Sequence, residues 1–253
     1  MTSSGQGKYL YCVISAEGPA EFPVAGVNGA QERVHCIQAS GLAVVVSDAL
    51  SDGYHFTRAT VMAHQSVIQE LMRSFTVLPF SFGTVASSEE EVRGLLARYR
   101  EELLSKLSYL EDKAEHELKA LWRDKELPFQ EIVAELDDIR RYRDAIGRQP
   151  PAKTYQERIQ IGRMVKEALE AKREAESRRI LDHLRPLAVE VRVNPILMDQ
   201  MILNAAFLLE KGTELRLEEA LVALDREYQD RVRFRLAGPS PPFNFVSMPI
   251  SWQ

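Results

Sequence analysis

The sequence contains few of the residues on which covalent cross-links and metal sites depend. Two of its 253 residues are cysteine and five are histidine. Cys12 and Cys36 lie in predicted strands, where we expect small core residues of a reducing compartment and no disulfide. The histidines show no metal-ligand spacing, and neither CxxC nor HExxH occurs. The sequence therefore predicts no disulfide framework and no metal site.

Long apolar runs and an excess of positive charge are also missing. No stretch approaches the roughly 18 consecutive apolar residues that suggest a membrane helix. The opening residues, MTSSGQG, lack the charged and apolar regions of a signal peptide. The net charge of −5 argues against nucleic-acid binding, for which a basic face is the usual requirement. We expect a cytoplasmic protein that neither spans a membrane nor binds nucleic acid.

Motifs for nucleotide binding and nucleophilic catalysis are absent as well. The sequence contains no GxGxxG, no GxxxxGK[ST] and no GxSxG. His64 is the best single candidate for chemistry, but it lies on the apolar face of a predicted helix, where we interpret it as a hydrogen-bonded core or interface histidine. Asp137 and Asp138 lie among many other acids and are interpreted as part of a solvated face. We therefore predict no catalytic, cofactor-binding or metal-binding residues and no enzymatic activity.

The composition is typical of a globular protein, with 45% hydrophobic and 27% charged residues. A chain of this length hides roughly 70–75% of its unfolded surface on folding, so it can build a core without covalent cross-links. The order of predicted strands and helices indicates an α+β fold. We expect two domains, at residues 1–110 and 111–253.

The first predicted domain contains strands, two helices and a tight hairpin. Apolar runs predict the strands, and apolar positions at helical spacing, such as Val61 and Ile68, predict the helices. Gly41 is expected to adopt a positive φ angle in the hairpin, and Ser88 with Glu91 is a predicted capping box. The predicted elements are strands at 8–15, 33–38, 42–47 and 77–83 and helices at 57–75 and 88–108, with a loop at 16–31.

The second predicted domain has the element order of a split βαβ motif. Thr154 with Glu157 is a predicted capping box for its longest helix. Alanine is the only apolar residue type between Glu170 and Arg179, so this stretch is expected to lie in solvent. We predict a ferredoxin-like domain with an inserted antiparallel, coiled-coil-like helical hairpin at about 125–184. The predicted elements are strands at 115–122, 187–193, 201–209 and 231–237, hairpin helices at 129–146 and 154–184, and a helix at 214–228.

The closing segment combines a strand, a proline-rich turn and an aromatic tail. Arginines alternate with apolar residues over 231–236, which is typical of a strand with one face on a core and one in water. The prolines that follow cannot continue a central strand, so the chain must turn there. We expect Phe243 and Phe245 to pack on their own domain. The alternative is a tail that docks onto a partner protein. Ile250 and Trp252 are expected to stay loose.

Three segments together form a recognisable pattern. They are YLYCVI at 9–14, VLPFSFGTV at 77–85 and VRFRLAGPSPPFNFV at 232–246. The chain resembles the gas vesicle protein F/L family, whose pattern has an opening tyrosine-rich strand, a Leu-Pro-x-x-Phe-Gly-Thr block and a closing Gly-Pro-x-Pro-Pro-x-x-Phe block. The resemblance spans nearly the full chain. The motif residues that carry it are Leu78, Pro79, Phe80, Phe82, Gly83, Gly238, Pro239, Pro241, Pro242, Phe243 and Phe245.

We interpret these motif residues as structural or interaction residues. Pro79 and Gly83 are expected to define the exit of a strand. Phe80 and Phe82 should share one face of that strand because they are two residues apart.

The resemblance implies a non-enzymatic accessory protein of gas vesicle assembly, with the F type preferred over the L type. It implies a cytoplasmic protein, associated with the gas vesicle shell, that contacts the apolar main shell protein and other accessory gas vesicle proteins. It also implies retention as a minor shell component and no cofactor. One alternative stays open, a small-ligand-binding or regulatory module, since paired ferredoxin-like domains often bind ligands between them.

Overall fold

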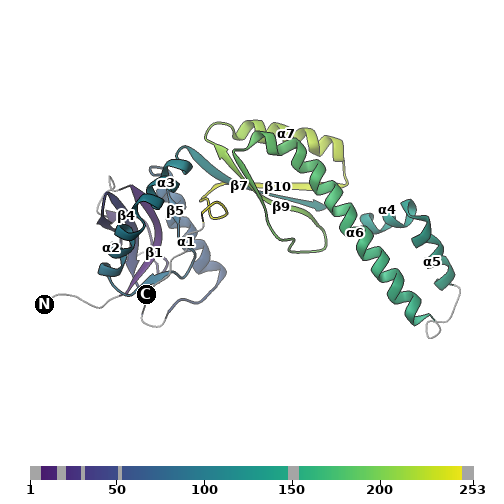
Figure 1. Ribbon diagram of the computed structural model, residues 1–253, viewed down its shortest axis with the longest axis horizontal. Helices are drawn as coiled ribbons and strands as arrows, with labels where there is room; N and C mark the ends of the chain where they lie inside the picture. Colours follow the sequence, from purple (N-terminus) through teal and green to yellow (C-terminus); the bar gives the residue numbers. More distant parts are fainter. Residues whose placement is uncertain (1–6, 16–20, 30–31, 51–52, 148–153, 247–253) are drawn as a thin grey trace. The chain divides into compact units, whose positions relative to one another are not determined.

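The computed structural model describes residues 7–15, 21–29, 32–50, 53–147 and 154–246 (Figure 1). By their internal contacts the residues divide into two compact units. The first unit comprises Met1–Glu115 together with Gly238–Gln253, and the second comprises His116–Ala237. The closing residues thus belong with the N-terminal part of the chain, whereas the predicted division into 1–110 and 111–253 places them with the C-terminal part.

The first unit contains a six-stranded sheet with β1 at its centre. Its strands are β1 (Lys8–Ser15), β2 (Glu21–Phe22), β3 (Val34–Ala39), β4 (Leu42–Asp48), β5 (Leu78–Pro79) and β6 (Val85–Ala86). The order is β2-β3-β4-β1-β5, and β6 also pairs with β1. β1 is antiparallel to β4, β5 and β6. Every residue of β1 except Ser15 is buried, which explains its nearly continuous apolar run.

A two-residue turn joins β3 to β4, as the sequence predicts. Ser40 and Gly41 have positive φ angles of 55° and 78°, which is the geometry of a type I′ hairpin turn. The predicted loop at 16–31, in contrast, contains β2, which pairs with β3. Two residues are too short to show an apolar period, so the sequence pattern could not reveal this strand.

Helix α1 (Arg58–Leu71) begins at the predicted position. The Thr57 hydroxyl accepts a hydrogen bond from the Thr60 N–H at 3.2 Å, and the Thr60 hydroxyl accepts one from the Thr57 N–H at 3.1 Å. These two bonds satisfy backbone donors that a helix start leaves free. The inner face of α1 buries His64, Val67, Ile68 and Leu71 against the sheet.

The single helix predicted at 88–108 is in fact two helices, α2 (Glu89–Arg98) and α3 (Arg100–Leu110). Tyr99 separates them because its φ of −105° and ψ of 15° leave the helical conformation. Only half of the predicted capping box forms. The Glu91 N–H donates to the Ser88 hydroxyl at 3.3 Å, but the Glu91 carboxylate accepts the N–H of Ser87.

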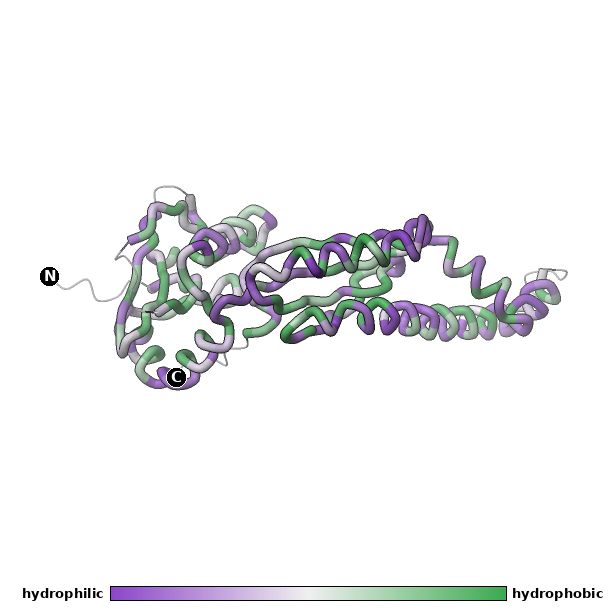
Figure 2. The backbone as a smooth tube through the Cα atoms, turned by 90° about the horizontal axis from the view of Figure 1, so that it is seen from above, coloured by the Kyte–Doolittle hydropathy of each residue, from purple (hydrophilic) through white to green (hydrophobic). Residues whose placement is uncertain are grey.

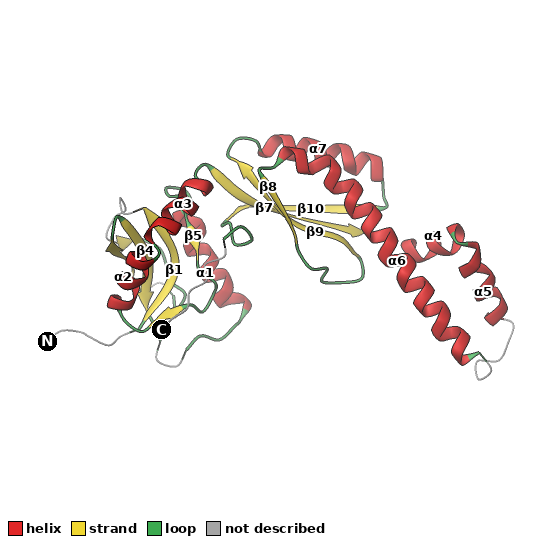
Figure 3. Cartoon of the chain, viewed as in Figure 1, coloured by secondary structure: helices red, strands yellow, loops and turns green. Residues whose placement is uncertain are grey.

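The second unit contains a four-stranded sheet in the order β10-β7-β9-β8 (Figure 3). The strands are β7 (Lys113–Trp122), β8 (Glu190–Val193), β9 (Met201–Glu210) and β10 (Val232–Ser240). The strands predicted at 187–193 and 231–237 therefore lie in one sheet. β8 begins later than predicted because Arg185–Leu187 form a turn of 3₁₀ helix.

Two helices, α6 (Tyr155–Leu184) and α7 (Glu214–Tyr228), pack on one face of this sheet (Figure 1). The end of α6 contributes Ile180, Leu181 and Leu184 to the core, and α7 contributes Leu217, Leu221 and Leu224 at helical spacing. They meet side chains of β7 and β9, the largest of which are Trp122 and Phe207.

The part of α6 before Ile180 contacts two shorter helices, α4 (Leu127–Glu135) and α5 (Asp137–Gly147). None of residues 170–179 is fully buried, and Figure 2 shows hydrophilic residues recurring along α6. The predicted solvent exposure holds only in part, because the side chains of Lys172 and Glu176 are 14% and 12% exposed. The helix predicted at 129–146 is interrupted at Leu136, whose φ of −106° and ψ of 99° are extended.

The capping box predicted at Thr154 and Glu157 is wrong. Thr154 does precede α6, but its hydroxyl makes no capping hydrogen bond. Instead, the hydroxyl accepts a hydrogen bond from Arg158 Nε at 3.1 Å. Within the described ranges, no helix is long and apolar enough to cross a membrane.

Candidate functional site

The motif residues of the middle and closing segments meet in the first unit, around His64. The middle segment enters through β5, where Leu78 and Pro79 pair with Val13 and Cys12 of β1. The Phe80 N–H then donates to the Tyr11 carbonyl at 2.9 Å. Gly83 follows with a φ of +83°, a conformation that favours glycine and turns the chain toward β6. These backbone bonds place the Phe80 carbonyl next to α1.

His64 is a buried, doubly hydrogen-bonded histidine. Its Nε2 lies 3.0 Å from the Phe80 carbonyl oxygen, which only accepts, so Nε2 carries the proton. Nδ1 therefore accepts the hydrogen bond from the Tyr9 hydroxyl at 2.9 Å. The hydroxyl in turn lies 3.3 Å from the Gly83 N–H, which donates to it. The interpretation of His64 as a hydrogen-bonded core histidine is confirmed.

Burial determines the charge of this histidine. Desolvation lowers the pKa of His64 to about 4, although the bond to the Phe80 carbonyl acts in the opposite direction. The same desolvation raises the pKa of the Tyr9 phenol well above its usual value. Both side chains are therefore neutral at pH 7, and they link α1, β1 and the middle motif through uncharged hydrogen bonds.

Aromatic rings surround His64 on several sides. The Phe82 ring lies edge-on at 5.9 Å between centroids, Tyr11 stacks at 5.7 Å, and Phe243 is tilted at 6.2 Å. Such ring pairs contribute about 0.5–1.5 kcal/mol each beyond their burial. The middle and closing motifs, which are about 160 residues apart, thus share one core. The members of this aromatic cluster are Tyr9, Tyr11, Tyr54, His64, Phe82 and Phe243.

The closing motif is held to the first unit by polar contacts as well. Glu115 is buried, and its carboxylate accepts the Asn244 N–H at 2.8 Å and the Asn244 side-chain amide at 2.5 Å. The Ser240 hydroxyl donates to the Glu115 carbonyl at 3.1 Å, and Gln69 Nε2 donates to the Pro239 carbonyl at 3.4 Å. Pro241, Pro242 and Phe245 are buried, whereas Gly238 and Pro239 are exposed.

Phe243 and Phe245 are expected to pack on their own domain, and that domain is the first unit rather than the predicted C-terminal one. Phe243 packs against the core of β1, β3, β4 and α1. The sequence could not show this, since the rings need apolar cover but nothing local specifies which core supplies it. The expectation for Ile250 and Trp252 lies outside the described residues.

Phe80 and Phe82 differ from the expected pair on one face of a strand. β5 ends at Pro79, and Phe82 lies in a turn, so the alternation of a strand does not extend to it. Phe80 is 2% exposed, and its carbonyl rather than its ring reaches His64. The Phe82 ring is half-buried in the aromatic cluster.

The aromatic cluster has an open side that sequence reasoning missed. Phe56 is 82% exposed, and its ring contacts Phe82 edge-on at 5.5 Å. Tyr54 contacts Phe82 at 6.5 Å, and its hydroxyl accepts the N–H of exposed Leu50 at 3.3 Å. We call Leu50, Tyr54, Phe56 and Phe82 the Phe56 surface. The sequence signal that could have indicated this surface is Phe56 itself, an aromatic residue between polar neighbours in a loop.

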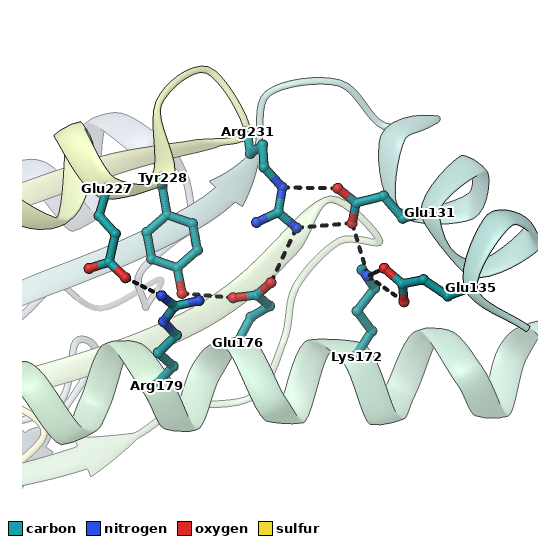
Figure 4. Close-up of polar contacts among 8 residues, drawn as sticks. All are labelled: Glu131, Glu135, Lys172, Glu176, Arg179, Glu227, Tyr228 and Arg231. Carbon is teal, nitrogen blue, oxygen red and sulfur yellow. Dashed lines mark hydrogen bonds and ion pairs between the residues drawn. The ribbon is translucent and has the colours of Figure 1, made fainter.

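In the second unit, charged side chains join α4, α6 and the start of β10 (Figure 4). Arg231 donates to both carboxylate oxygens of Glu131, at 2.9 and 3.0 Å, and to Glu176 at 3.3 Å. Lys172 lies 3.0 Å from Glu131 and 2.9 Å from Glu135. We call Glu131, Glu135, Lys172, Glu176 and Arg231 the ion cluster. It connects elements up to 100 residues apart in sequence.

The hydrogen bonds of the ion cluster favour its charged forms. Burial opposes the charge on Glu131, but hydrogen bonds from Arg231 and Lys172 outweigh burial and hold the pKa of Glu131 below its usual value. Beside the cluster, the Tyr228 hydroxyl donates to Glu176 at 2.7 Å, and Arg179 pairs with Glu227. The Arg179 guanidinium also lies 5.6 Å from the centre of the Tyr228 ring.

A hollow, but no metal-binding cluster, lies among the other described side chains. Over the described ranges, no group of three or more histidine, cysteine, aspartate or glutamate residues is placed to hold a metal ion. A hollow of about 430 Å³ lies between α4, α5 and α6. It contains the Asp137 and Asp138 pair, and its lining is Glu135, Leu136, Asp137, Asp138, Ile139, Met164, Glu167 and Ala168.

Fold and site together define a mixed α+β protein in which the motif residues build a core shared by distant parts of the chain. The family model described as "Gas vesicle synthesis protein GvpL/GvpF" matches residues 7–247. The chain therefore belongs to this family of gas vesicle synthesis proteins, which confirms the resemblance seen in its three motifs.

Individual relatives agree over almost the whole chain. Gas vesicle protein F of Nostoc sp. is 26% identical, and the match covers 96% of this chain and 98% of that protein. Gas vesicle protein F of a Streptomyces sp. is 27% identical, with 94% and 98% covered. The crystal structure of GvpF from Anabaena sp. is similar with a TM-score of 0.83 at 26% identity, covering 97% of this chain and 100% of that one. The helices and two sheets described above thus match the GvpF architecture.

Proposed function

We propose that this protein is a non-enzymatic accessory factor of gas vesicle assembly that binds the main shell protein. The family match over residues 7–247 is the observation that carries this proposal. In the same proposal, the protein acts in the cytoplasm, contacts other accessory gas vesicle proteins, and is retained at the shell as a minor component. An F-type role agrees with the names of the Nostoc and Streptomyces relatives.

The Phe56 surface is the part of the first unit that best suits such binding. A ring that is 82% exposed, with an aromatic cluster behind it, offers apolar area on a firmly packed base. Burying a side chain of this size contributes about 1.5–3 kcal/mol, which corresponds to a tenfold or greater change in affinity. A protein with apolar surface of its own would gain this energy on contact.

The proposal is tested by measuring how the full-length chain binds purified main shell protein. Wild type should bind, and Phe56→Ser should bind at least tenfold more weakly. Leu215→Ser is the matched control, because Leu215 is also exposed but lies on α7 of the second unit. An absence of binding by wild type would disprove the function. Equal binding by wild type and Phe56→Ser would disprove the assignment to this surface.

We also propose that the two units are separate domains and that the second is ferredoxin-like. The support is the strand order β10-β7-β9-β8, in which the first and last strands of the unit are neighbours and the third lies beside the first. In this description α4, α5 and α6 form the inserted antiparallel hairpin, supported by the contacts of α6 with both shorter helices. Independent unfolding transitions of the two units would support the division.

A further inference from the structure

The strand β8 is one edge of the sheet in the second unit. Within the part of the chain that the structure describes, β8 pairs only with β9, and the pairing is antiparallel. The Asn194 N–H donates to the Asn204 carbonyl at 2.7 Å, directly after the strand. Because antiparallel strands alternate between inward and outward bonding, residues 190 and 192 face β9. The N–H and C=O groups of Val191 and Val193 are then directed away from the sheet.

Exposed apolar side chains border this edge. Val189 is 44% exposed and Val193 is 55% exposed. Exposed apolar side chains continue in the loop that follows, at Ile196, Leu197 and Met198. An edge strand bordered by exposed apolar residues is a site for pairing with another strand.

The charges on β8 identify which strand fits. Glu190 and Arg192 form an ion pair of 2.9 Å within the strand. If a second β8 lies antiparallel with Val191 opposite Val191, Glu190 of each copy faces Arg192 of the other. Val189 precedes β8, and its N–H donates to the Leu208 carbonyl at 2.9 Å, so in this register it offers only its side chain to Val193 of the other copy. A register centred on Arg192 would instead place two arginines opposite each other, which is unfavourable.

We propose that β8 is a self-complementary edge through which two copies of this chain associate. The two strands pair antiparallel, centred on Val191, so that two four-stranded sheets become one continuous sheet. The outward N–H and C=O groups of Val191 bond to each other across the two-fold axis. Opposite charges and exposed valines are matched reciprocally, as an isologous interface requires.

The test uses charge reversal on the full-length chain, with sedimentation velocity over a range of concentrations. Wild type should form a dimer as concentration rises. Arg192→Glu and Glu190→Arg should each weaken the dimer at least tenfold, since each places like charges opposite each other. The double variant Glu190→Arg with Arg192→Glu should restore it, because the exchanged charges face each other correctly again. Arg233→Glu on β10, at the other edge of the sheet, is the control and should dimerise like wild type.

Three results would overturn the proposal. The first is a wild-type chain that stays monomeric at every concentration, which would leave this edge to a different partner. The second is a dimer that neither single reversal weakens. The third is a double variant as weak as the single ones, which would exclude the register centred on Val191. Circular dichroism of each variant confirms that it is folded. Because no shell protein is present, the outcome is independent of the proposed function.

Discussion

At the scale of single residues, His64 shows how a polar side chain becomes part of a core. The ring is 1% exposed, and both of its nitrogens are hydrogen-bonded. A buried polar group that lost either partner would cost about 1–3 kcal/mol. The motif residues around it therefore act in two ways. Phe82 and Phe243 contribute rings, whereas Phe80 and Gly83 contribute backbone groups.

The depressed pKa of His64 predicts a specific pH dependence of stability. The folded pKa is about 4 and the ordinary value is 6.5, so between these values the unfolded chain binds more protons than the folded one. The contribution of neutral, buried His64 to the free energy of unfolding is therefore fully present above pH 6.5. It is lost as the pH is lowered toward 4, by up to about 3 kcal/mol.

Chemical denaturation at pH 7 and pH 4.5 measures this effect. Glutamine can form both hydrogen bonds of His64 but does not titrate. Between pH 7 and pH 4.5 the free energy of unfolding of His64→Gln should therefore fall by about 2 kcal/mol less than that of wild type. His183→Gln, at an exposed position, is the control and should behave like wild type. An unchanged pH dependence in His64→Gln would contradict the prediction.

At the scale of elements, the ion cluster explains how α4 is attached. Only Pro128 and Ile132 of α4 are buried, so apolar contacts alone hold this helix weakly. Glu131 links it to Arg231 before β10 and to Lys172 on α6. A buried ion pair is not necessarily stabilising compared with an apolar pair, but removing one partner of it is costly.

Neutralising Glu131 should release α4 locally. Glu131 has a side chain that is 20% exposed and Glu135 one that is 61% exposed, so the two make a matched pair on one helix. Glu131→Gln should cost about 2–3 kcal/mol and speed hydrogen exchange in α4. Glu135→Gln should cost less than about 1 kcal/mol, because exposed pairs contribute little. Equal exchange rates in the two variants would show that the cluster does not hold the helix.

At the scale of the whole molecule, the closing segment returns to the unit that the N-terminal part of the chain builds. Phe243 reaches the ring of His64, and Asn244 satisfies the buried carboxylate of Glu115. The first unit is therefore completed by residues from both ends of the described chain, and the segment between them forms the second unit.

Two nested deletions test this arrangement. Removing residues 243–253 takes away Phe243, Asn244 and Phe245 and should destabilise the first unit by at least about 3 kcal/mol, through lost ring burial and an unsatisfied buried carboxylate. Removing only residues 248–253, which lie outside the described ranges, should leave stability and shell-protein binding unchanged. Urea unfolding followed by hydrogen exchange assigns the loss to a unit. A larger loss in the second unit would contradict the shared core.

The sequence by itself determined most elements of this protein and its family. Local sequence patterns were sufficient to predict β1, the Ser40–Gly41 hairpin and the helix at 214–228. The spacing of apolar residues and the residue types of a turn depend only on neighbouring positions. The absence of fully buried residues at 170–179 followed from their charge in the same way, but the contacts of Lys172 with α4 and of Glu176 with Arg231 did not. The three ordered motifs indicated the family that the match over residues 7–247 confirms.

Only the tertiary structure decided where the distant segments meet. The breaks at Tyr99 and Leu136 leave the apolar period almost unchanged, so no local pattern announces them. The partner of Phe243 could not be predicted either, since an apolar ring is stabilised by any core and the choice depends on the path of the whole chain. For the same reason the bond between Arg231 and Glu131, 100 residues apart, is visible only in the folded protein. Apolar burial is non-directional, so which surfaces meet is a property of the fold and not of any segment.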